Sequence, residues 1–278
     1  MTRDRARTAP TTGWRRIATA VWRWPRDPQI YGRLEVDAEP IVHAVERLRE
    51  TTGERVTITH VVVKALAMAL RDNPSVNSRL RRGRFVPRAD VDVFVILATG
   101  EGNDLSGVKV GAADTKSIPA IAREIAERAR KARDGAGGDI DKGKRLLAVL
   151  PLTMRRIALR MGAFLTSDLG IDLARYGLPR DAFGGAMVSS VGMFGITEGW
   201  APLSPIYRVP LLILIGQIES KAVVRDGVVV AGRVLPITAT IDHRWVDGEG
   251  ISSIVRTFRS VLADPLAHES TARIARGA

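Results

Sequence analysis

Apolar and polar residues alternate along the chain with two periods, one typical of helices and the other of strands. Residues 39–50 carry apolar side chains at Ile41, Val45 and Leu48, the spacing of a helix with one buried face. Residues 59–71 are apolar nearly all round, so they are predicted to form a buried helix that ends before Asn73-Pro74. The first third of the chain is therefore predicted to contribute two helices to the hydrophobic core.

The remaining pattern predicts further helices and a strand-rich second half. Helices are expected over Trp14–Trp24, over Ser117–Arg133, and where Ile251, Ile254, Val255, Phe258, Val261 and Leu262 share one face before Asp264-Pro265. Strands are expected over Arg33–Val36, Arg84–Val86, Val91–Ala98, Val108–Ala112, Ala186–Val191, Leu211–Ile218, Lys221–Val230 and Val234–Ile241, with a loop over Gly100–Gly107 and a hairpin turn at Asp226-Gly227. This order predicts an α/β (α+β) sandwich.

Composition narrows the class of protein. Hydrophobic residues make up 45% and charged residues 26% of the 278 residues, which is ordinary for a globular protein. The sequence has no cysteine, which excludes disulfides, thiolate metal sites and a cysteine nucleophile. No apolar run approaches the ~20 residues that span a bilayer, and no secretory signal follows the basic N-terminus. A cytoplasmic location is therefore expected.

The net charge of +12 favours polyanionic ligands in general, such as nucleic acid, anionic lipid or a phosphorylated cofactor. The charge alone does not choose among them, and a basic surface that only keeps the protein soluble is the alternative. Nucleic acid is not expected as a partner because no recognition motif accompanies the charge.

One histidine stands out as a candidate base. His243 lies where the strand predicted to end at Ile241 gives way to a helix that begins near Gly250. A histidine can take a proton from a thiol or hydroxyl at neutral pH, and strand ends hold reactive groups rigidly. Asp247 and Gly248 follow four and five residues later. An ordinary polar turn is the alternative interpretation of these residues.

Several ordered motifs resemble the acyltransferase catalytic domain of 2-oxoacid dehydrogenase complexes. Thr240–Gly248 resembles the family signature D-H-R-x-x-D-G, and Val188–Gly195 resembles its serine- and glycine-containing segment. The resemblance runs from about Arg15 to Pro265. Other matching segments are Leu34–Ala38, the helix predicted to begin at Thr59, Asn73–Asn77, Asp90–Val93 and the prolines Pro202 and Pro205.

The resemblance implies a chloramphenicol-acetyltransferase-like fold, a mixed sheet flanked by helices, in a homotrimer or higher oligomer with its active site between subunits. It implies that His243 deprotonates an attacking thiol or hydroxyl, and that Ser189 donates a hydrogen bond to the tetrahedral oxyanion, an interaction typically worth ~3 kcal/mol. Asp247 would hold the loop in place, with Arg15 or Arg16 as its partner.

The resemblance also implies an acyl-CoA as acyl donor and substrate. No metal is expected, because no second histidine stands at helical ligand spacing from another. His43 and His60 are predicted to be structural, and His268 lies in the tail.

The predicted organisation is a disordered basic tail over 1–13, a catalytic domain over 14–265 and a flexible tail over 266–278. The chain shows no lipoyl motif of its own, and Leu105–Ala112 lacks the proline that the family usually has there. Residues 139–183 form a cationic, amphipathic insertion, expected to be a lid or wall of the acyl or acceptor site. A membrane surface is the alternative partner for the insertion.

The sequence thus predicts an acyltransferase that moves an acyl group between a CoA-type thioester and a thiol or hydroxyl acceptor. The acceptor could belong to an acyl carrier or a lipoyl protein. The alternative is a non-catalytic module of the same fold, used for oligomeric assembly or membrane association.

Overall fold

The computed structural model describes residues 28–81, 84–99, 104–133, 151–176, 179–204 and 208–274. In this part of the chain, seven strands form one mixed sheet with the order β1-β9-β7-β6-β4-β5, and β8 pairs with β9 beyond it. The expected mixed sheet is therefore confirmed. Its strands are β1 (Gln29–Asp37), β4 (Val93–Thr99), β5 (Asp104–Val110), β6 (Ala186–Ser190), β7 (Leu211–Ile215), β8 (Glu219–Arg225) and β9 (Val228–Asp242).

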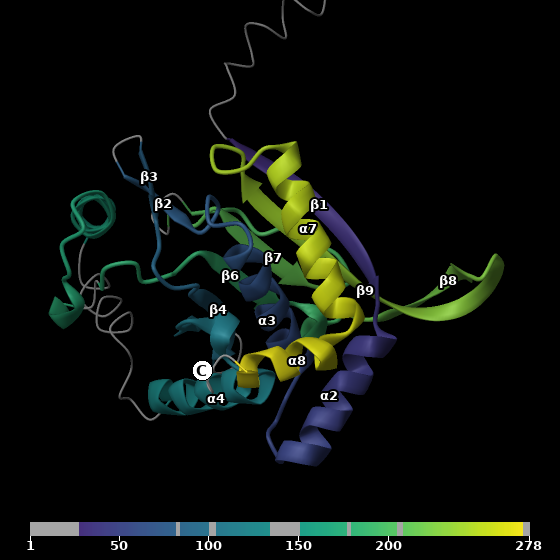
Figure 1. The fold of residues 1–278 in the computed structure, drawn as a ribbon. Helices are drawn as coiled ribbons and strands as arrows, with labels where there is room; N and C mark the ends of the chain where they lie inside the picture. The colour runs from purple at the N-terminus through teal and green to yellow at the C-terminus, as the bar shows by residue number, and fades with distance from the viewer. Residues whose placement is uncertain are drawn as a thin grey trace, which may run out of the picture.

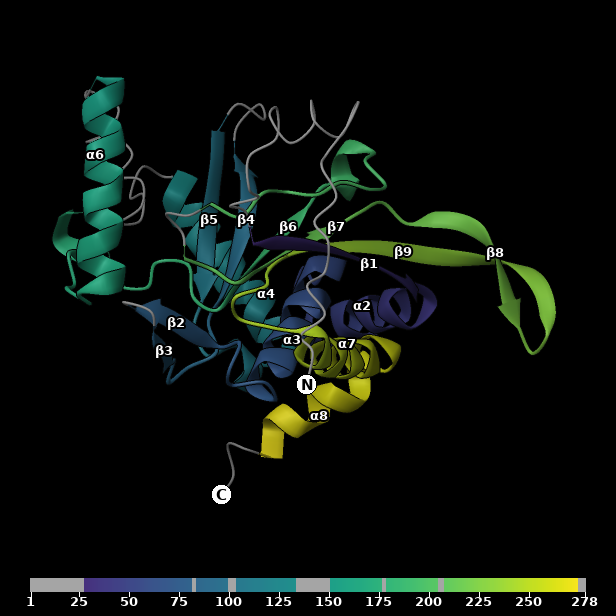
Figure 2. The same ribbon diagram turned by 90° about the horizontal axis from the view of Figure 1, so that it is seen from above.

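Helices α2, α3, α4 and α7 lie on one side of the sheet (Figures 1 and 2). Helix α6 and the β8–β9 hairpin lie at opposite ends of the molecule in both views. The described helices are α2 (Glu39–Thr52), α3 (Ile58–Arg71), α4 (Ile118–Arg133), α6 (Leu152–Ala163), α7 (Gly248–Ala263) and α8 (Pro265–Ile274), and a small ribbon of β2 (Ser78–Arg81) and β3 (Arg84–Pro87) lies beside the sheet.

Helix α3 is the centre of the core. Its residues His60 to Leu70 are all buried, as the all-round apolar pattern predicts. Lys64 is among them, with 2% of its surface exposed. Its ammonium group donates to the carbonyl oxygens of Asp114 at 2.5 Å and Lys116 at 2.8 Å, so the buried charge is solvated by backbone. Burial lowers the pKa of Lys64.

The strand register brings distant segments together. β9 runs antiparallel to both β1 and β7, so that Asp242, its last residue, pairs with Gln29 at the start of β1. β6 runs parallel to β4 and β7, and Ser189 on β6 pairs with Leu214 on β7. His243, directly after β9, and Ser189, near the end of β6, therefore lie at two separate positions on the sheet.

Ion pairs and hydrogen bonds fasten the segment that returns from α6 to the core. Arg88, a buried residue, makes a two-pronged contact with the carboxylate of Asp181 at 2.9 and 3.0 Å. The Arg88 guanidinium helps to hold the pKa of Asp181 below its usual range against the opposing effect of burial. Asp168 accepts a side-chain hydrogen bond from Arg208 at 3.0 Å, and its carbonyl accepts one from Arg81 at 3.2 Å.

Some boundaries differ from the sequence prediction. β5 begins at Asp104, inside the predicted loop 100–107, because its backbone pairs with β4. The predicted strand 221–230 is two strands, since the Asp226-Gly227 hairpin turn ends β8 and begins the long β9. Segments 1–13 and Trp14–Trp24 lie outside the described residues.

The tail predicted over 266–278 is partly wrong. Residues 265–274 form helix α8, which Pro265 begins at the first helical position, where a missing N–H costs nothing. The carboxylate of Glu269 accepts the backbone N–H of Ile118 at 2.8 Å and so joins α8 to the start of α4. Among the described helices, none is long and apolar enough to cross a membrane.

Replacing Lys64 with Met should destabilise the protein by about 2–4 kcal/mol, because it leaves the carbonyl oxygens of Asp114 and Lys116 without the donor that Lys64 provides. Urea unfolding measures the loss. Lys131→Met, at an exposed position on α4, is the control and should change stability little. A Lys64→Met protein as stable as this control would show that the buried ammonium contributes nothing.

Candidate active site

The loop after β9 presents His243 to solvent. The His243 side chain is exposed, while its backbone N–H donates to the carbonyl of Pro28 at 2.9 Å. The residue before it, Asp242, is buried and belongs to the sheet. The backbone at His243 is therefore fixed to the start of β1, and only its imidazole is free to reach a ligand.

The residues after His243 stiffen the loop. Arg244 closes a fork on the Asp242 carboxylate, with distances of 2.9 Å from Nε and 2.5 Å from Nη2. The Arg244 guanidinium also lies 5.3 Å from the ring centroid of buried Trp245. Trp245 donates its indole N–H to the carbonyl of Ser78 at 3.3 Å and packs edge-on against Phe85. These contacts hold the loop that carries His243 rigidly in place.

Asp247 caps helix α7. Its carboxylate accepts the backbone N–H of Gly250 at 3.0 Å, which satisfies one of the free donors at the helix start. The structure thus places Asp247 at the junction between the loop and α7. Arg15 and Arg16, its predicted partners, lie outside the described residues.

Ser189 and Ser190 leave β6 on opposite faces of the sheet. Ser189 is half-buried and shares the face of Met187, whose neighbours form a small apolar cluster away from the helices. Ser190 faces the helices and lines a cavity between them and the sheet. The sequence motif does not distinguish these two directions.

Within one chain, Ser189 and His243 do not meet. Through Leu214, Ser189 lies level with Thr238 on β9, and His243 follows Thr238 by five residues. At ~3.3 Å per residue and ~4.8 Å between strands, the two residues are roughly 20 Å apart. A site that uses both therefore needs a second copy of the chain.

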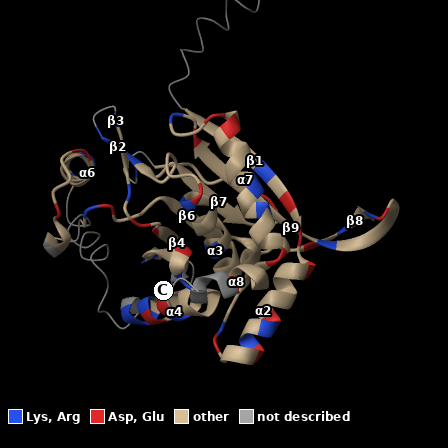
Figure 3. Ribbon diagram, in the orientation of Figure 1, with Lys and Arg blue, Asp and Glu red and all other residues tan. Residues whose placement is uncertain are grey.

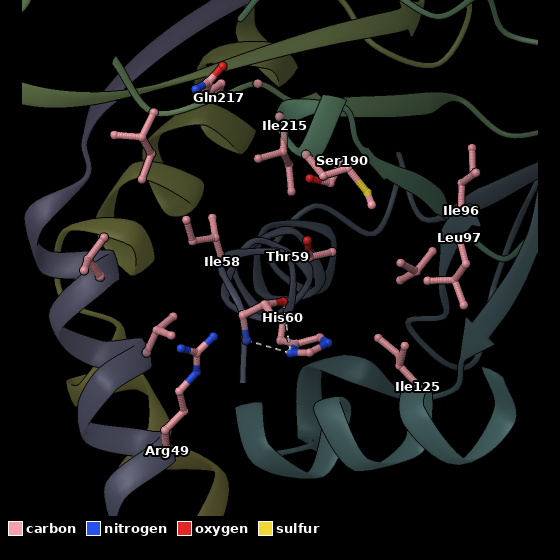
Figure 4. A pocket seen from close by; sticks show the side chains of 18 of the residues that line it. Arg49, Ile58, Thr59, His60, Ile96, Leu97, Ile125, Ser190, Ile215 and Gln217 are labelled. Atoms are coloured by element: carbon pink, nitrogen blue, oxygen red, sulfur yellow. Dashed lines mark hydrogen bonds between the residues drawn. The ribbon is translucent and has the colours of Figure 1, made fainter. Parts of the chain in front are cut away.

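A cavity of about 810 Å³ lies between the helices and the sheet (Figure 4). Most of its walls are apolar, and Ser190, Gln217 and His60 supply polar groups. The Nδ1 atom of His60 accepts the N–H of Thr57 at 3.0 Å, so the neutral ring carries its proton on Nε2. Burial, with a smaller contribution from the charge of Arg49, lowers the pKa of His60 to about 4.

A second cavity, of about 510 Å³, lies beside the histidine loop. Helix α6 forms one wall, and Asp242, Arg244 and Trp245 form another. The insertion predicted to be a lid or wall of the site contains α6. The structure places α6 across the cavity from Asp242, Arg244 and Trp245. The other lining residues are Pro28, Gln29, Arg156, Leu159, Arg160, Ala163, Leu203, Ser204, Arg208 and Val209.

The described residues contain no group of three or more histidine, aspartate or glutamate side chains that could hold a metal. Basic and acidic residues are interspersed along α2, α4 and β1 (Figure 3).

A sequence model of the 2-oxoacid dehydrogenases acyltransferase (catalytic domain) matches residues 5–141 and 179–268, well over half of the chain. The chain belongs to this family. The acyltransferase match leaves out residues 142–178, which include α6.

Relatives of this acyltransferase domain agree with the match. The dihydrolipoyllysine-residue acetyltransferase component of the pyruvate dehydrogenase complex of Zymomonas mobilis is 24% identical over 243 residues, covering 86% of this chain and 45% of that protein. The chain spans about half the length of the curated relatives it matches.

Two solved structures show the same fold. The cubic core of a pyruvate dehydrogenase multienzyme complex has a TM-score of 0.63 at 19% identity, covering 88% of this chain and 85% of that one. The dihydrolipoamide acetyltransferase of Azotobacter vinelandii, studied for the role of a serine, a histidine and an asparagine in its catalytic mechanism, has a TM-score of 0.62 at 19% identity over the same shares. The fold expected from the resemblance is confirmed.

Sequence reasoning missed part of the surroundings of the site. It did not single out Ser190, nor the arginines of α6 as neighbours of the histidine motif. The alternation of strand residues could have indicated that Ser189 and Ser190 point apart. The insertion was expected beside the site, but nothing local in the sequence indicates which of its residues face Asp242 and Arg244.

His60 makes stability depend on pH. Its pKa is lowered in the folded state, so the contribution of the neutral ring is present above the unfolded pKa of ~6.5 and is lost as pH falls towards the folded value of about 4. The loss should reach about 3 kcal/mol. His60→Gln retains a capping side chain without a titrating ring, so it should remove most of this loss. Urea unfolding at pH 7 and pH 4 measures the difference, and an equal pH dependence in both proteins would contradict the assignment.

Proposed function

We propose that the protein is an acyltransferase that moves an acyl group between a CoA-type thioester and a thiol or hydroxyl acceptor, with His243 as general base. The observation that carries the proposal is the exposed imidazole on a loop fixed by Pro28, Asp242 and Trp245, in a chain of the acyltransferase family. A base with this support can meet an acceptor while the backbone beneath it stays in place.

The proposed reaction has two steps. His243 takes the proton of the acceptor S–H or O–H, and the acceptor sulfur or oxygen forms a bond to the thioester carbonyl carbon. The tetrahedral oxyanion that results receives a hydrogen bond from the Ser189 hydroxyl. The carbon–sulfur bond to CoA then breaks, and the departing thiolate takes the proton back from the His243 imidazolium. Protons and electron pairs balance without a metal or a redox partner.

The proposed active site lies between two copies of the chain, with His243 from one and Ser189 from the other. Their wide separation on one sheet supports this arrangement. A homotrimer or higher oligomer would create such interfaces by rotational symmetry. That a solved relative forms a cubic core supports assembly in this family.

Asp247 has a positioning role in the proposal. Its cap on α7 fixes the far end of the loop that carries His243. The Azotobacter relative was studied through a serine, a histidine and an asparagine. The set proposed here has a serine and a histidine in common with it and an aspartate in the third place.

The proposed acceptor is carried by a separate acyl carrier or lipoyl protein, or is a small thiol or alcohol. The relatives named above are acetyltransferases of lipoyllysine residues, which makes a dihydrolipoyl dithiol the first acceptor to assay.

Replacing His243 with Ala should lower kcat by about 10²–10⁴-fold, because the loop has no other imidazole to take the acceptor proton. Release of CoA from acetyl-CoA in the presence of dihydrolipoamide measures the rate. His43→Ala, on the exposed face of α2, is the matched control and should retain activity. Unchanged transfer by His243→Ala would reject the mechanism, and transfer absent from the wild type with every acyl-CoA and acceptor assayed would favour the non-catalytic module.

Ser189→Ala should lower kcat by about 10²–10³-fold through loss of one oxyanion donor. Because the two groups are proposed to come from different copies, mixing Ser189→Ala and His243→Ala chains by unfolding and refolding should restore activity at about a quarter of the interfaces. No restoration in oligomers shown by mass to be mixed would contradict the shared site.

A further inference from the structure

The cavity between α6 and the histidine loop combines free positive charge with an apolar floor. Arg156 and Arg160 stand one helical turn apart on α6 and both line the cavity. In the described part of the chain, neither guanidinium makes an ion pair or hydrogen bond. Two uncompensated cations at one cavity wall form an attractive site for an anion.

The other two arginines of the cavity are partly compensated. Arg244 pairs with Asp242, and Arg208 pairs with Asp168 at 3.0 Å. The Nε atom of Arg208 is nevertheless buried without a hydrogen-bond partner among the described residues. Arg208 also has a φ of 54°, a left-handed conformation that a non-glycine residue adopts at a cost. With four arginines against two aspartates, a net positive charge remains near the cavity.

The rest of the cavity suits a less polar group. Leu159, between the two free arginines, lines it with Ala163, Leu203, Val209 and Trp245. The volume of about 510 Å³ falls within the ~300–1,000 Å³ of typical small-molecule sites. The occupant that matches these walls has an anionic end and a largely uncharged body.

We propose that this cavity binds the phosphate end of a pantetheine thioester, so that α6 forms the donor subsite of the acyltransferase. Guanidinium groups match phosphate oxygens with paired hydrogen bonds, and the unpaired Arg156 and Arg160 are placed to provide them. The inference rests on the proposed function, which supplies the thioester class. Asp242 and Arg244, on either side of His243, line the same cavity, so a donor held there lies next to the base.

The phosphate has two sources with the same chemistry, free CoA and the phosphopantetheine arm of a carrier protein. Helix α6 lies in the segment that the family match leaves out. Arg156 and Arg160 therefore lie outside the matched part, whereas Asp242, Arg244 and Trp245 lie within it. The test is directed at the two arginines.

Isothermal titration of the full chain with CoA, 4′-phosphopantetheine and pantetheine tests the proposal without turnover. The wild type should bind CoA more tightly than pantetheine, which has no phosphate. Arg156→Gln/Arg160→Gln should weaken CoA binding by about 10- to 100-fold and leave pantetheine binding unchanged. Arg47→Gln/Arg128→Gln is the control, since it removes two exposed arginines of α2 and α4 and the same total charge.

If CoA and 4′-phosphopantetheine both bind in a way that depends on the two arginines, the subsite accepts the arm of a carrier protein as well as CoA. If only CoA binds in this way, the arginines contact the nucleotide phosphates of CoA. Equal affinity of the wild type for CoA and pantetheine, or unchanged CoA affinity in the folded Arg156→Gln/Arg160→Gln variant, would overturn the proposal.

His243→Ala separates this inference from the proposed function. The variant should bind CoA as the wild type does and fail to transfer. If it binds normally and also transfers normally, the base is wrong while the phosphate subsite stands. If transfer depends on His243 but CoA binding ignores both arginines, the subsite alone is wrong.

Discussion

The pairing of β9 with both β1 and β7 is the constraint on which the candidate site depends. β9 is fifteen residues long and lies between two partners, so its hydrogen bonds to both sides set the level at which it ends. Asp242 is its last residue, and the N–H of His243 closes the edge by bonding to Pro28. The sheet therefore fixes the backbone at the point from which the exposed His243 imidazole projects.

The same sheet keeps the other candidate group away. Alternation along β6 directs Ser189 and Ser190 to opposite faces, and the register places Ser189 two strands away and five residues back from His243. A rigid sheet cannot bring these groups together by a small motion. The two groups could therefore act together only across two copies of the chain, as proposed above. In the described part of the chain, α6 lies beside the loop that carries His243.

Helices could be predicted from the sequence because the spacing of their apolar residues shows which face is buried. α2, α3 and α7 begin and end within about two residues of the prediction, a normal uncertainty for helix boundaries. β5 was predicted too short. Its early residues become a strand through pairing with β4, and Gly107 leaves room for the Phe94 ring. These paired residues are near one another in the chain, but Asp104 to Gly107 include no β-branched or aromatic residue, so their composition did not predict a strand.

By itself, the sequence determined the family, the helices with one-sided or all-round apolar patterns, and His243 as the candidate base, since these are properties of spacing and residue type. Only the tertiary structure decided that Ser189 lies far from His243 and that Arg156 and Arg160 lie near the loop. The reason is physical: strand register and helix docking depend on contacts between remote segments. His243 can be singled out from residue types and spacing in the sequence. Which side chains lie near it is decided by the fold.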